Sequence, residues 1–142
     1  MIHFISITSF RERLSALLKI KRAVYGGVTS EICNAFKNAP VEQIRTNRDM
    51  ILMDNDFVVI KLRLPDKKQK QSKSEGYRLI YMVMKHEDVV IFLDIYPKRG
   101  PMQQLDIDDN ELNRLLREFV NEFNDNTVVF HDIDNVLKEI QR

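Results

Sequence analysis

Cations and one phenol gather in two apolar segments in the middle of the chain. Arg78 stands near the start of the segment 77–84, and Tyr96 and Lys98 stand at the end of the segment 89–98. A basic run from Lys61 to Lys73 precedes them. Positive charges and a hydroxyl group on adjacent strands are suited to binding a phosphate backbone and to stabilising negative charge that develops on phosphorus. These residue types therefore favour phosphate chemistry.

The composition is that of a soluble globular protein. A chain of 142 residues with 44% hydrophobic and 30% charged residues is long enough to bury the core of one domain. No apolar run approaches the length of a membrane span, and the N-terminus lacks the features of a secretory signal, so we expect a cytoplasmic protein. Cys33 is the only cysteine, which excludes an internal disulfide and a cluster of thiolate ligands.

The net charge of +1 hides an uneven distribution along the chain. Residues 1–105 hold 18 basic against 11 acidic side chains, whereas residues 106–142 hold 4 against 10. A basic part of this kind is suited to binding a polyanionic partner. The alternative is that the charge asymmetry arises by chance, together with a solvated acidic helix, and indicates no partner. We expect residues 1–105 to form the core of the domain and residues 106–142 to form an acidic helical extension packed on it.

Two helices are predicted near the N-terminus, after a short strand at residues 2–7. Ser9 and Glu12 have the spacing of a capping box, in which each side chain bonds a free amide of the other residue. Apolar residues then recur at helical spacing until two consecutive glycines end the pattern. A second helix is expected to follow and to end before Pro40.

From residue 50 the periodicity changes to that of β-strands. Apolar, β-branched or aromatic runs, separated by polar breaks, occupy residues 50–53, 57–64, 77–84 and 89–96. We expect an α+β fold in which the two N-terminal helices pack on one face of a mostly antiparallel, twisted sheet. Alternation along the strands places Phe92 with the polar side chains on the other, uncovered face. Those polar side chains are Lys61, Arg63, Arg78, Asp94 and Tyr96.

The acidic extension is predicted to be mainly helical. Asp108 begins a segment with capping form, and a strongly amphipathic pattern follows at residues 112–123. A short strand is expected at residues 127–130 and one or two helical turns at residues 134–140. Asp106 is interpreted, like Asp108, as a helix-capping group, because no His or Cys accompanies these aspartates as a metal ligand would.

The order of these elements, together with two motifs, resembles the RelE/ParE toxin superfamily of bacterial toxin–antitoxin modules. The motifs are Gly76-Tyr77-Arg78-Leu79-Ile80-Tyr81 and Leu93-Asp94-Ile95-Tyr96-Pro97-Lys98, preceded by Lys61-Leu62-Arg63. The resemblance covers roughly residues 2–105 and is greatest for RelE- and HigB-type members. Members of the family are usually strongly basic, and several place a histidine at the catalytic edge. This chain is nearly neutral, and its three histidines lie outside the motifs.

The resemblance implies a metal-independent endoribonuclease that cuts mRNA, in RelE-type members at the decoding site of the ribosome. The ribose 2′-OH attacks the adjacent phosphate and leaves a 2′,3′-cyclic phosphate and a 5′-OH. Such chemistry needs a base near the 2′-OH, positive charge for the phosphorane and an acid for the leaving oxygen. The implied partners are mRNA, the ribosome and a cognate antitoxin protein. Neither a cofactor, a metal nor a membrane is implied, and the oligomeric state stays open.

Carried over to this chain, the resemblance implies catalytic roles for Arg78, Tyr96 and Lys98. Arg78 would stabilise the phosphorane, Tyr96 would stack on a base or transfer a proton, and Lys98 would be its basic partner. An unperturbed tyrosine or lysine titrates at about pH 10, so the identity of the general base stays open. The implied RNA- or phosphate-binding residues are Lys61, Arg63, Lys67, Lys68, Lys73 and Arg99.

Two further functions remain open on the sequence alone. A toxin of the same superfamily can inhibit DNA gyrase by binding it, without nuclease chemistry. The chain can also be a protein-binding module whose basic face is masked by its own acidic extension. Arg78 has a structural alternative as well, an ion pair with Asp94 on the neighbouring strand.

Overall fold

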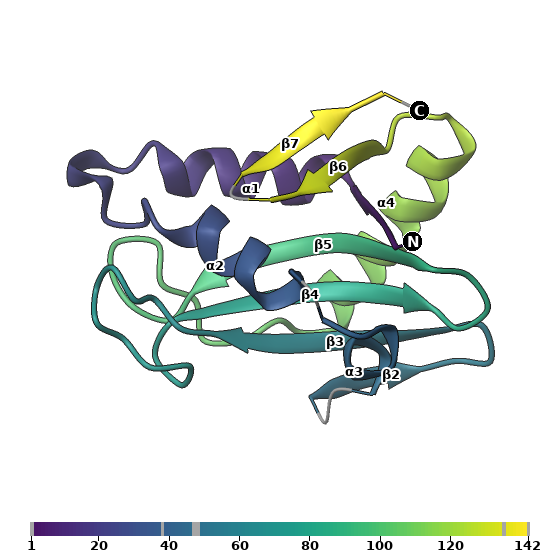
Figure 1. The fold of residues 1–142 in the computed structure, drawn as a ribbon, viewed down its shortest axis with the longest axis horizontal. Helices are drawn as coiled ribbons and strands as arrows, with labels where there is room; N and C mark the ends of the chain where they lie inside the picture. The colour runs from purple at the N-terminus through teal and green to yellow at the C-terminus, as the bar shows by residue number, and fades with distance from the viewer. Residues whose placement is uncertain (1, 38, 47–48, 135, 142) are drawn as a thin grey trace.

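The protein is built around one mixed sheet whose middle strands carry the two motifs. A computed structural model describes residues 2–37, 39–46, 49–134 and 136–141. Seven strands lie in the order β2-β3-β4-β5-β1-β6-β7 (Figure 1). β1 is parallel to β5, and each of the other neighbouring pairs is antiparallel.

The bounds of the elements are as follows. The strands are β1 His3–Ser6, β2 Met50–Met53, β3 Phe57–Leu64, β4 Tyr77–Met84, β5 Val89–Pro97, β6 Val129–Ile133 and β7 Leu137–Ile140. The helices are α1 Thr8–Leu18, the short 3₁₀ helix η1 Lys21–Ala23, α2 Val28–Phe36, α3 Val41–Arg45 and α4 Asp109–Asn124.

Helices cover both faces of the sheet. α2 and α3 lie in front of it and α4 lies behind it (Figure 1). In the front layer Phe36 of α2 packs edge-on against Tyr81 of β4 and Phe92 of β5. In the back layer the amphipathic helix α4 buries Leu112 and Leu115. Two covered faces explain why β4 and β5 are apolar at nearly every position, because neither face of these strands meets water.

The predicted fold, two N-terminal helices on one face of a mostly antiparallel sheet with a helical extension, is wrong. The chain enters the sheet through β1, which pairs in parallel with β5. The helical turns predicted at residues 134–140 are wrong where the structure describes them, since Leu137–Ile140 form β7, which pairs with β6, and β6 pairs with β1. Residue 135 lies outside the described residues. The acidic extension therefore supplies α4 and also two strands of the sheet. Spaced apolar residues in a short segment are compatible with either structure, and here pairing with β1 decides for the strand.

One β-bulge changes which side chains share a face. Ile80 of β4 lies opposite Asp94, but the next residue, Tyr81, lies opposite Phe92, so Leu93 is the extra residue of β5. Phe92 therefore points to the front face and Asp94 to the back face. The prediction that these two residues share a face is wrong, because simple alternation does not anticipate an inserted residue.

The two helix starts predicted from capping motifs have different outcomes. Asp108 is the N-cap of α4, and its carboxylate accepts a hydrogen bond of 2.8 Å from the Glu111 amide, as predicted. Ser9 instead lies inside α1, which begins at Thr8. The free amides of Thr8 and Ser9 donate to two carboxylates of α4, at distances of 2.9–3.1 Å. A partner helix thus replaces the local cap.

Within the described parts of the chain, no helix combines the length and the apolar character needed to cross a bilayer.

Candidate functional site

The candidate catalytic residues meet on the back face of the sheet. Arg63 of β3, Arg78 of β4 and Tyr96 of β5 lie directly opposite one another across three neighbouring strands. Opposed residues point to the same side of a sheet, and Lys61, two residues before Arg63, points to that side too. Lys98 follows the end of β5. These five residues, Lys61, Arg63, Arg78, Tyr96 and Lys98, are called the basic cluster below.

Arg78 is the most constrained member of the basic cluster. Its guanidinium donates to the carbonyls of Lys73 at 2.9 Å, Ser74 at 3.0 Å and Tyr77 at 3.2 Å, and the residue is 8% exposed. These bonds fasten the long loop before β4 to the sheet. Burial, followed by the charge of Arg63, lowers the pKa of Arg78. The proposed structural alternative, an ion pair between Arg78 and Asp94, is absent from the contacts of the described residues, because Asp94 faces Arg13 at 3.8 Å.

A carboxylate already lies among the side chains of the basic cluster. The Oδ1 atom of Asp106 accepts from the Lys61 ammonium at 2.9 Å and from the Tyr96 hydroxyl at 3.5 Å. The Lys98 ammonium donates to the carbonyl oxygen of the preceding residue, Leu105. The interpretation of Asp106 as a helix-capping group is therefore wrong. No pattern in the sequence points to this contact, because Asp106 lies in a connection without periodicity.

The electrostatic environment shifts the pKa values of Tyr96 and Lys98 in opposite directions. Burial, followed by the nearby charge of Asp106, raises the pKa of Tyr96, so this phenol keeps its proton and acts as a donor. Partial burial, followed by the charge of Arg78, lowers the pKa of Lys98. A lysine with a lowered pKa provides more of the neutral amine near physiological pH, which is the form that accepts a proton. The two shifts thus favour the neutral form of Lys98 and the protonated form of Tyr96.

The other predicted phosphate-binding residues do not join the basic cluster. Lys68 lies over Gly26 and Gly27. Arg99 forms an exposed ion pair of 3.5 Å with Glu75. Lys67 and Lys73 line a pocket on the front face of the sheet. The predicted set is thus divided, because the side chains of Lys67, Lys68 and Lys73 lie toward α2 and the residues before it, although Arg78 binds the backbone of the same loop.

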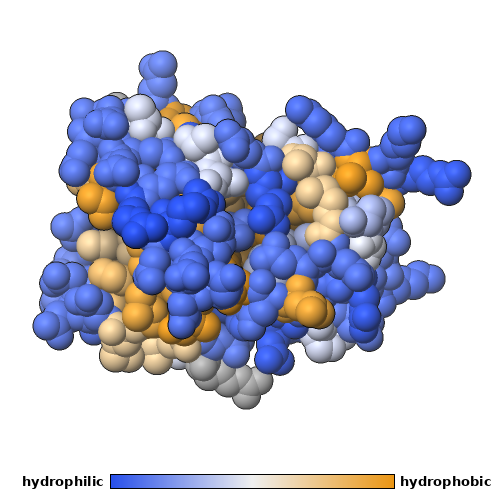
Figure 2. Space-filling view, turned by 180° about the vertical axis from the view of Figure 1, so that it is seen from behind, coloured by the Kyte–Doolittle hydropathy of each residue, from blue (hydrophilic) through white to orange (hydrophobic). Residues whose placement is uncertain are grey.

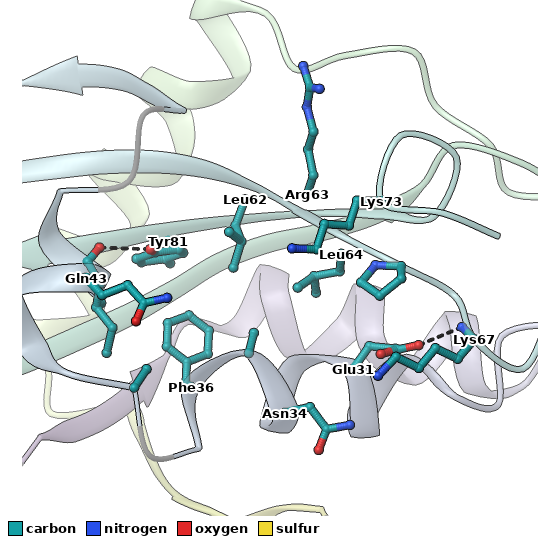
Figure 3. A pocket seen from close by; sticks show the side chains of 14 residues that line it. Glu31, Asn34, Phe36, Gln43, Leu62, Arg63, Leu64, Lys67, Lys73 and Tyr81 are labelled. Atoms are coloured by element: carbon teal, nitrogen blue, oxygen red, sulfur yellow. Dashed lines mark hydrogen bonds between the residues drawn. The ribbon is translucent and has the colours of Figure 1, made fainter.

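The front pocket is a separate site of about 330 Å³ between α2, α3 and β3. Its wall includes Phe36, Leu62 and Tyr81, and the Lys73 side chain reaches toward them (Figure 3). Arg63 points away from these side chains, to the other side of the sheet (Figure 3). The Lys67 amide donates to the buried carboxylate of Glu31 at 2.7 Å. Arg63 is the member of the basic cluster that also borders this pocket, whereas Arg78, Tyr96 and Lys98 are not among its lining residues.

Asp94 is a second carboxylate of the back face. It lies on the same face as Tyr96, two residues before it, and is 3% exposed. It lines a cavity of about 320 Å³ with Arg13 of α1 and Arg114 of α4. Burial raises the pKa of Asp94 to about 6, although Arg13 opposes this shift. The sequence identifies its face correctly but not its burial, which depends on the packing of α1 and α4.

The outer surface over the back face is mostly hydrophilic, with separate apolar patches (Figure 2). α4 contributes partly exposed apolar side chains there, since Val120 is 54% and Phe123 57% exposed. The part of the chain that is described contains no group of three or more His, Cys, Asp or Glu side chains arranged to hold a metal ion.

Comparison of the chain with protein-family models and with curated proteins gives no match.

Proposed function

We propose that the chain is a metal-independent endoribonuclease that cleaves mRNA, as its motif resemblance to RelE- and HigB-type toxins implies. The observation that carries this proposal is that Lys61, Arg63, Arg78 and Tyr96 share one face of the sheet beside Lys98, with a carboxylate oxygen already bound to Lys61 and Tyr96. A site that binds a carboxylate in this way offers the same donors to a phosphate oxygen. The fixed charge of Arg78 lies beside Tyr96 and would stabilise the phosphorane.

The proposed proton transfers follow from the opposite pKa shifts of the two residues. Neutral Lys98 takes the proton of the ribose 2′-OH, and the oxygen attacks the adjacent phosphorus. The P–O5′ bond then breaks, and Tyr96 gives its proton to the leaving oxygen. The products are a 2′,3′-cyclic phosphate and a 5′-OH, and Lys61 and Arg63 hold the non-bridging oxygens. Partners in this proposal are mRNA on the ribosome and, in the cell, a cognate antitoxin.

The test is cleavage of mRNA by purified protein with ribosomes, in the presence of EDTA, with the chemistry of the new ends mapped. Tyr96→Phe and Lys98→Met should each reduce cleavage by about 100-fold, the usual contribution of a general acid or base. Lys138→Met is the matched control, since Lys138 is an exposed lysine of β7, and it should cleave like wild type. Arg78→Ala is a poor probe because it also releases the loop that Arg78 fastens.

The pH dependence of cleavage shows whether Lys98 acts as a general base or only contributes a positive charge. Cleavage should rise with pH up to the lowered pKa of Lys98, because only the neutral amine accepts the proton. Lys98→Arg keeps the charge but should lose both the activity and this dependence. Equal cleavage by wild type, Lys98→Arg and Lys98→Met would contradict the proposal, and so would ends that carry a 5′-phosphate.

A second candidate is favoured by one contact. The hydrogen bonds that Asp106 accepts from Lys61 and Tyr96 support a protein-binding module whose basic face is masked by its own acidic extension. Such a module would leave mRNA intact in every variant, including those in which Asp106 is neutralised. No contact of the described residues favours inhibition of gyrase, which DNA damage in growing cells would reveal.

A further inference from the structure

The connection between β5 and α4 crosses the candidate active site. Its residues 99–107 are called the strap below. The strap is fixed at its start by Tyr25, whose hydroxyl donates to the Arg99 carbonyl at 2.8 Å and accepts from the Met102 amide at 3.0 Å. The side-chain oxygen of Gln104 then accepts from the Arg13 guanidinium at 3.0 Å, and the backbone amide of Gln104 donates to the Pro97 carbonyl. These contacts bring the next residues, Leu105 and Asp106, over the basic cluster.

The strap occupies donors of the site, beside the loop whose Lys73 and Ser74 carbonyls already bind Arg78. Tyr96 is 0% and Arg78 8% exposed, although both are proposed to act on RNA. Over them, Asp106 directs its Oδ1 atom at Lys61 and Tyr96, and Lys98 is bound to the Leu105 carbonyl. A phosphate group needs the same donors. RNA and this part of the strap therefore compete for one set of hydrogen bonds.

Few contacts hold the central part of the strap down. Leu105 is 88% exposed, so it adds almost no apolar burial. The Asp106 side chain is 62% exposed, and an ion pair this open to water contributes at most about 1 kcal/mol. Tyr25 holds the start of the strap and Ile107 packs against the core at its other end, so the part that can move is limited to Leu105 and Asp106 and would break the 2.9 Å bond from the Gln104 side chain to the Asp106 carbonyl. A polyanion that contacts several cations at once can supply the energy for this movement.

From these contacts we propose that the strap autoinhibits the site, with the Asp106 carboxylate occupying the position of a backbone phosphate until RNA displaces it. This regulation rests on the proposed function, because it takes RNA as the displacing anion. Asp106 also accepts from the Ile107 amide at 2.8 Å. An asparagine at this position can keep that local bond while the charge that competes with phosphate is lost.

The test compares Asp106→Asn with Asp109→Asn in the 142-residue chain. Asp109→Asn removes the same charge three residues further on, from an exposed position in the first turn of α4. Binding is measured with a single-stranded RNA whose 2′-hydroxyls are methylated, which cannot be cleaved by 2′-OH attack. Amide exchange of the strap is followed by mass spectrometry, and cleavage is measured with unmodified mRNA and ribosomes.

Asp106→Asn should bind the methylated RNA roughly tenfold more tightly than wild type, because a larger fraction of molecules is open. Its strap amides should exchange faster, and Asp109→Asn should resemble wild type in both respects. Equal affinities of the two variants, or unchanged exchange of the strap, would overturn the proposal even if mRNA is cleaved. Faster exchange with tighter binding, but no cleavage by any variant, would support the strap and overturn the proposed nuclease function.

Discussion

Asp94 carries the least satisfied buried polar group on the back face. Its Oδ1 atom accepts from the Ile95 amide at 2.8 Å, whereas its buried Oδ2 atom has no hydrogen-bond partner among the described residues. Arg13, at 3.8 Å, is too distant for a hydrogen bond. A buried, half-satisfied carboxylate is costly when it is charged, which is why burial raises its pKa to about 6.

The sign of the pH effect follows from that shift. An unfolded aspartate titrates at about pH 4, so the folded state holds this proton more tightly than the unfolded state does. Stability from this group is therefore complete below about pH 4 and is lost as the pH rises through about 6. Two units of pKa shift correspond to about 2–3 kcal/mol of lost stability at neutral pH.

Asp94→Asn should recover part of this loss. We expect the free energy of unfolding to rise by about 1–2 kcal/mol at pH 8 and to change little at pH 4, because the amide is never charged. Urea unfolding of both proteins at the two pH values measures the difference. Asp109→Asn changes an exposed position, so its small effect on the free energy of unfolding should be the same at both pH values. A gain from Asp94→Asn that is the same at pH 4 and pH 8 would contradict this account.

At the scale of elements, a buried pair ties the C-terminal hairpin to the start of the chain. The Nε2 atom of His131 in β6 lies 2.6 Å from the Ser6 hydroxyl of β1, and its Nδ1 atom lies 3.1 Å from the Leu137 carbonyl of β7. A carbonyl only accepts, so Nδ1 carries the proton and Nε2 accepts from Ser6. Arg11 donates to the same hydroxyl at 3.0 Å. Burial of the ring favours the neutral imidazole, in which Nε2 is the acceptor.

Acid should weaken the attachment of the hairpin. Burial lowers the pKa of His131, so the unfolded chain, with a histidine pKa of about 6.5, takes up this proton first. Stability from this group is complete above about pH 6.5 and falls as the pH drops toward the lowered folded pKa. The slope should reach at most about 1.4 kcal/mol per pH unit between pH 6.5 and that pKa.

Variants of two histidines isolate this contribution. His131→Gln should remove the slope, because glutamine does not titrate, whereas His86→Gln should keep it, since His86 is exposed. The free energy of unfolding from urea titrations between about pH 7.5 and pH 5 gives both slopes. An unchanged slope in His131→Gln would assign the acid sensitivity to other groups.

The elements that the sequence predicts well are those whose pattern is local. The runs at residues 57–64, 77–84 and 89–96 correspond to β3, β4 and β5 almost residue for residue, because β-branched and aromatic runs with polar breaks favour strands. Helix α4 is predicted by its amphipathic stripe. The strand expected at residues 127–130 overlaps β6. The strand β7 and the helix α3 are short, and their structure depends on distant partners, so local patterns misassign the first and miss the second.

The same distinction holds for the candidate site. Alternation predicts that Lys61, Arg63, Arg78 and Tyr96 share a face, and the register confirms it. The expectation that this face is uncovered is wrong, because α4 and the strap lie over it. Which lysines join the cluster also depends on the path of a loop, which composition does not reveal. The catalytic roles themselves stay predictions.

At the scale of the whole molecule, the acidic part of the chain is a structural layer. Its net charge of −6, summed over residues 106–142, faces a basic part of +7. Glu122 accepts from the Thr8 amide at 3.0 Å, and Glu118 from the Ser9 amide at 2.9 Å, so acidic residues of α4 satisfy the start of α1. The carboxylates also lie at the positive end of the α1 dipole. The charge asymmetry therefore serves packing between helices as well as the contact of Asp106 with the basic cluster.

It follows that residues 1–105 should not fold alone. Truncation would remove the apolar side chains of Leu112, Leu115 and Leu137, all buried in the core, and would leave β1 with an unpaired edge. Burial of each such leucine contributes about 2–3 kcal/mol, and the three together approach the whole stability of a typical domain. Circular dichroism and urea unfolding of a 1–105 chain should show no cooperative transition.

The variant Glu118→Gln/Glu122→Gln of the 142-residue chain is the matched control, because it removes two charges of the layer and keeps its apolar side chains. It should still unfold cooperatively, with a lower free energy of unfolding, since the amides of Thr8 and Ser9 lose charged acceptors. If the 1–105 chain instead folded cooperatively, residues 106–142 would be an appended cover rather than part of the core. The inhibitory role of the strap could then be tested by deletion, whereas a fold that needs this layer allows only substitutions such as Asp106→Asn.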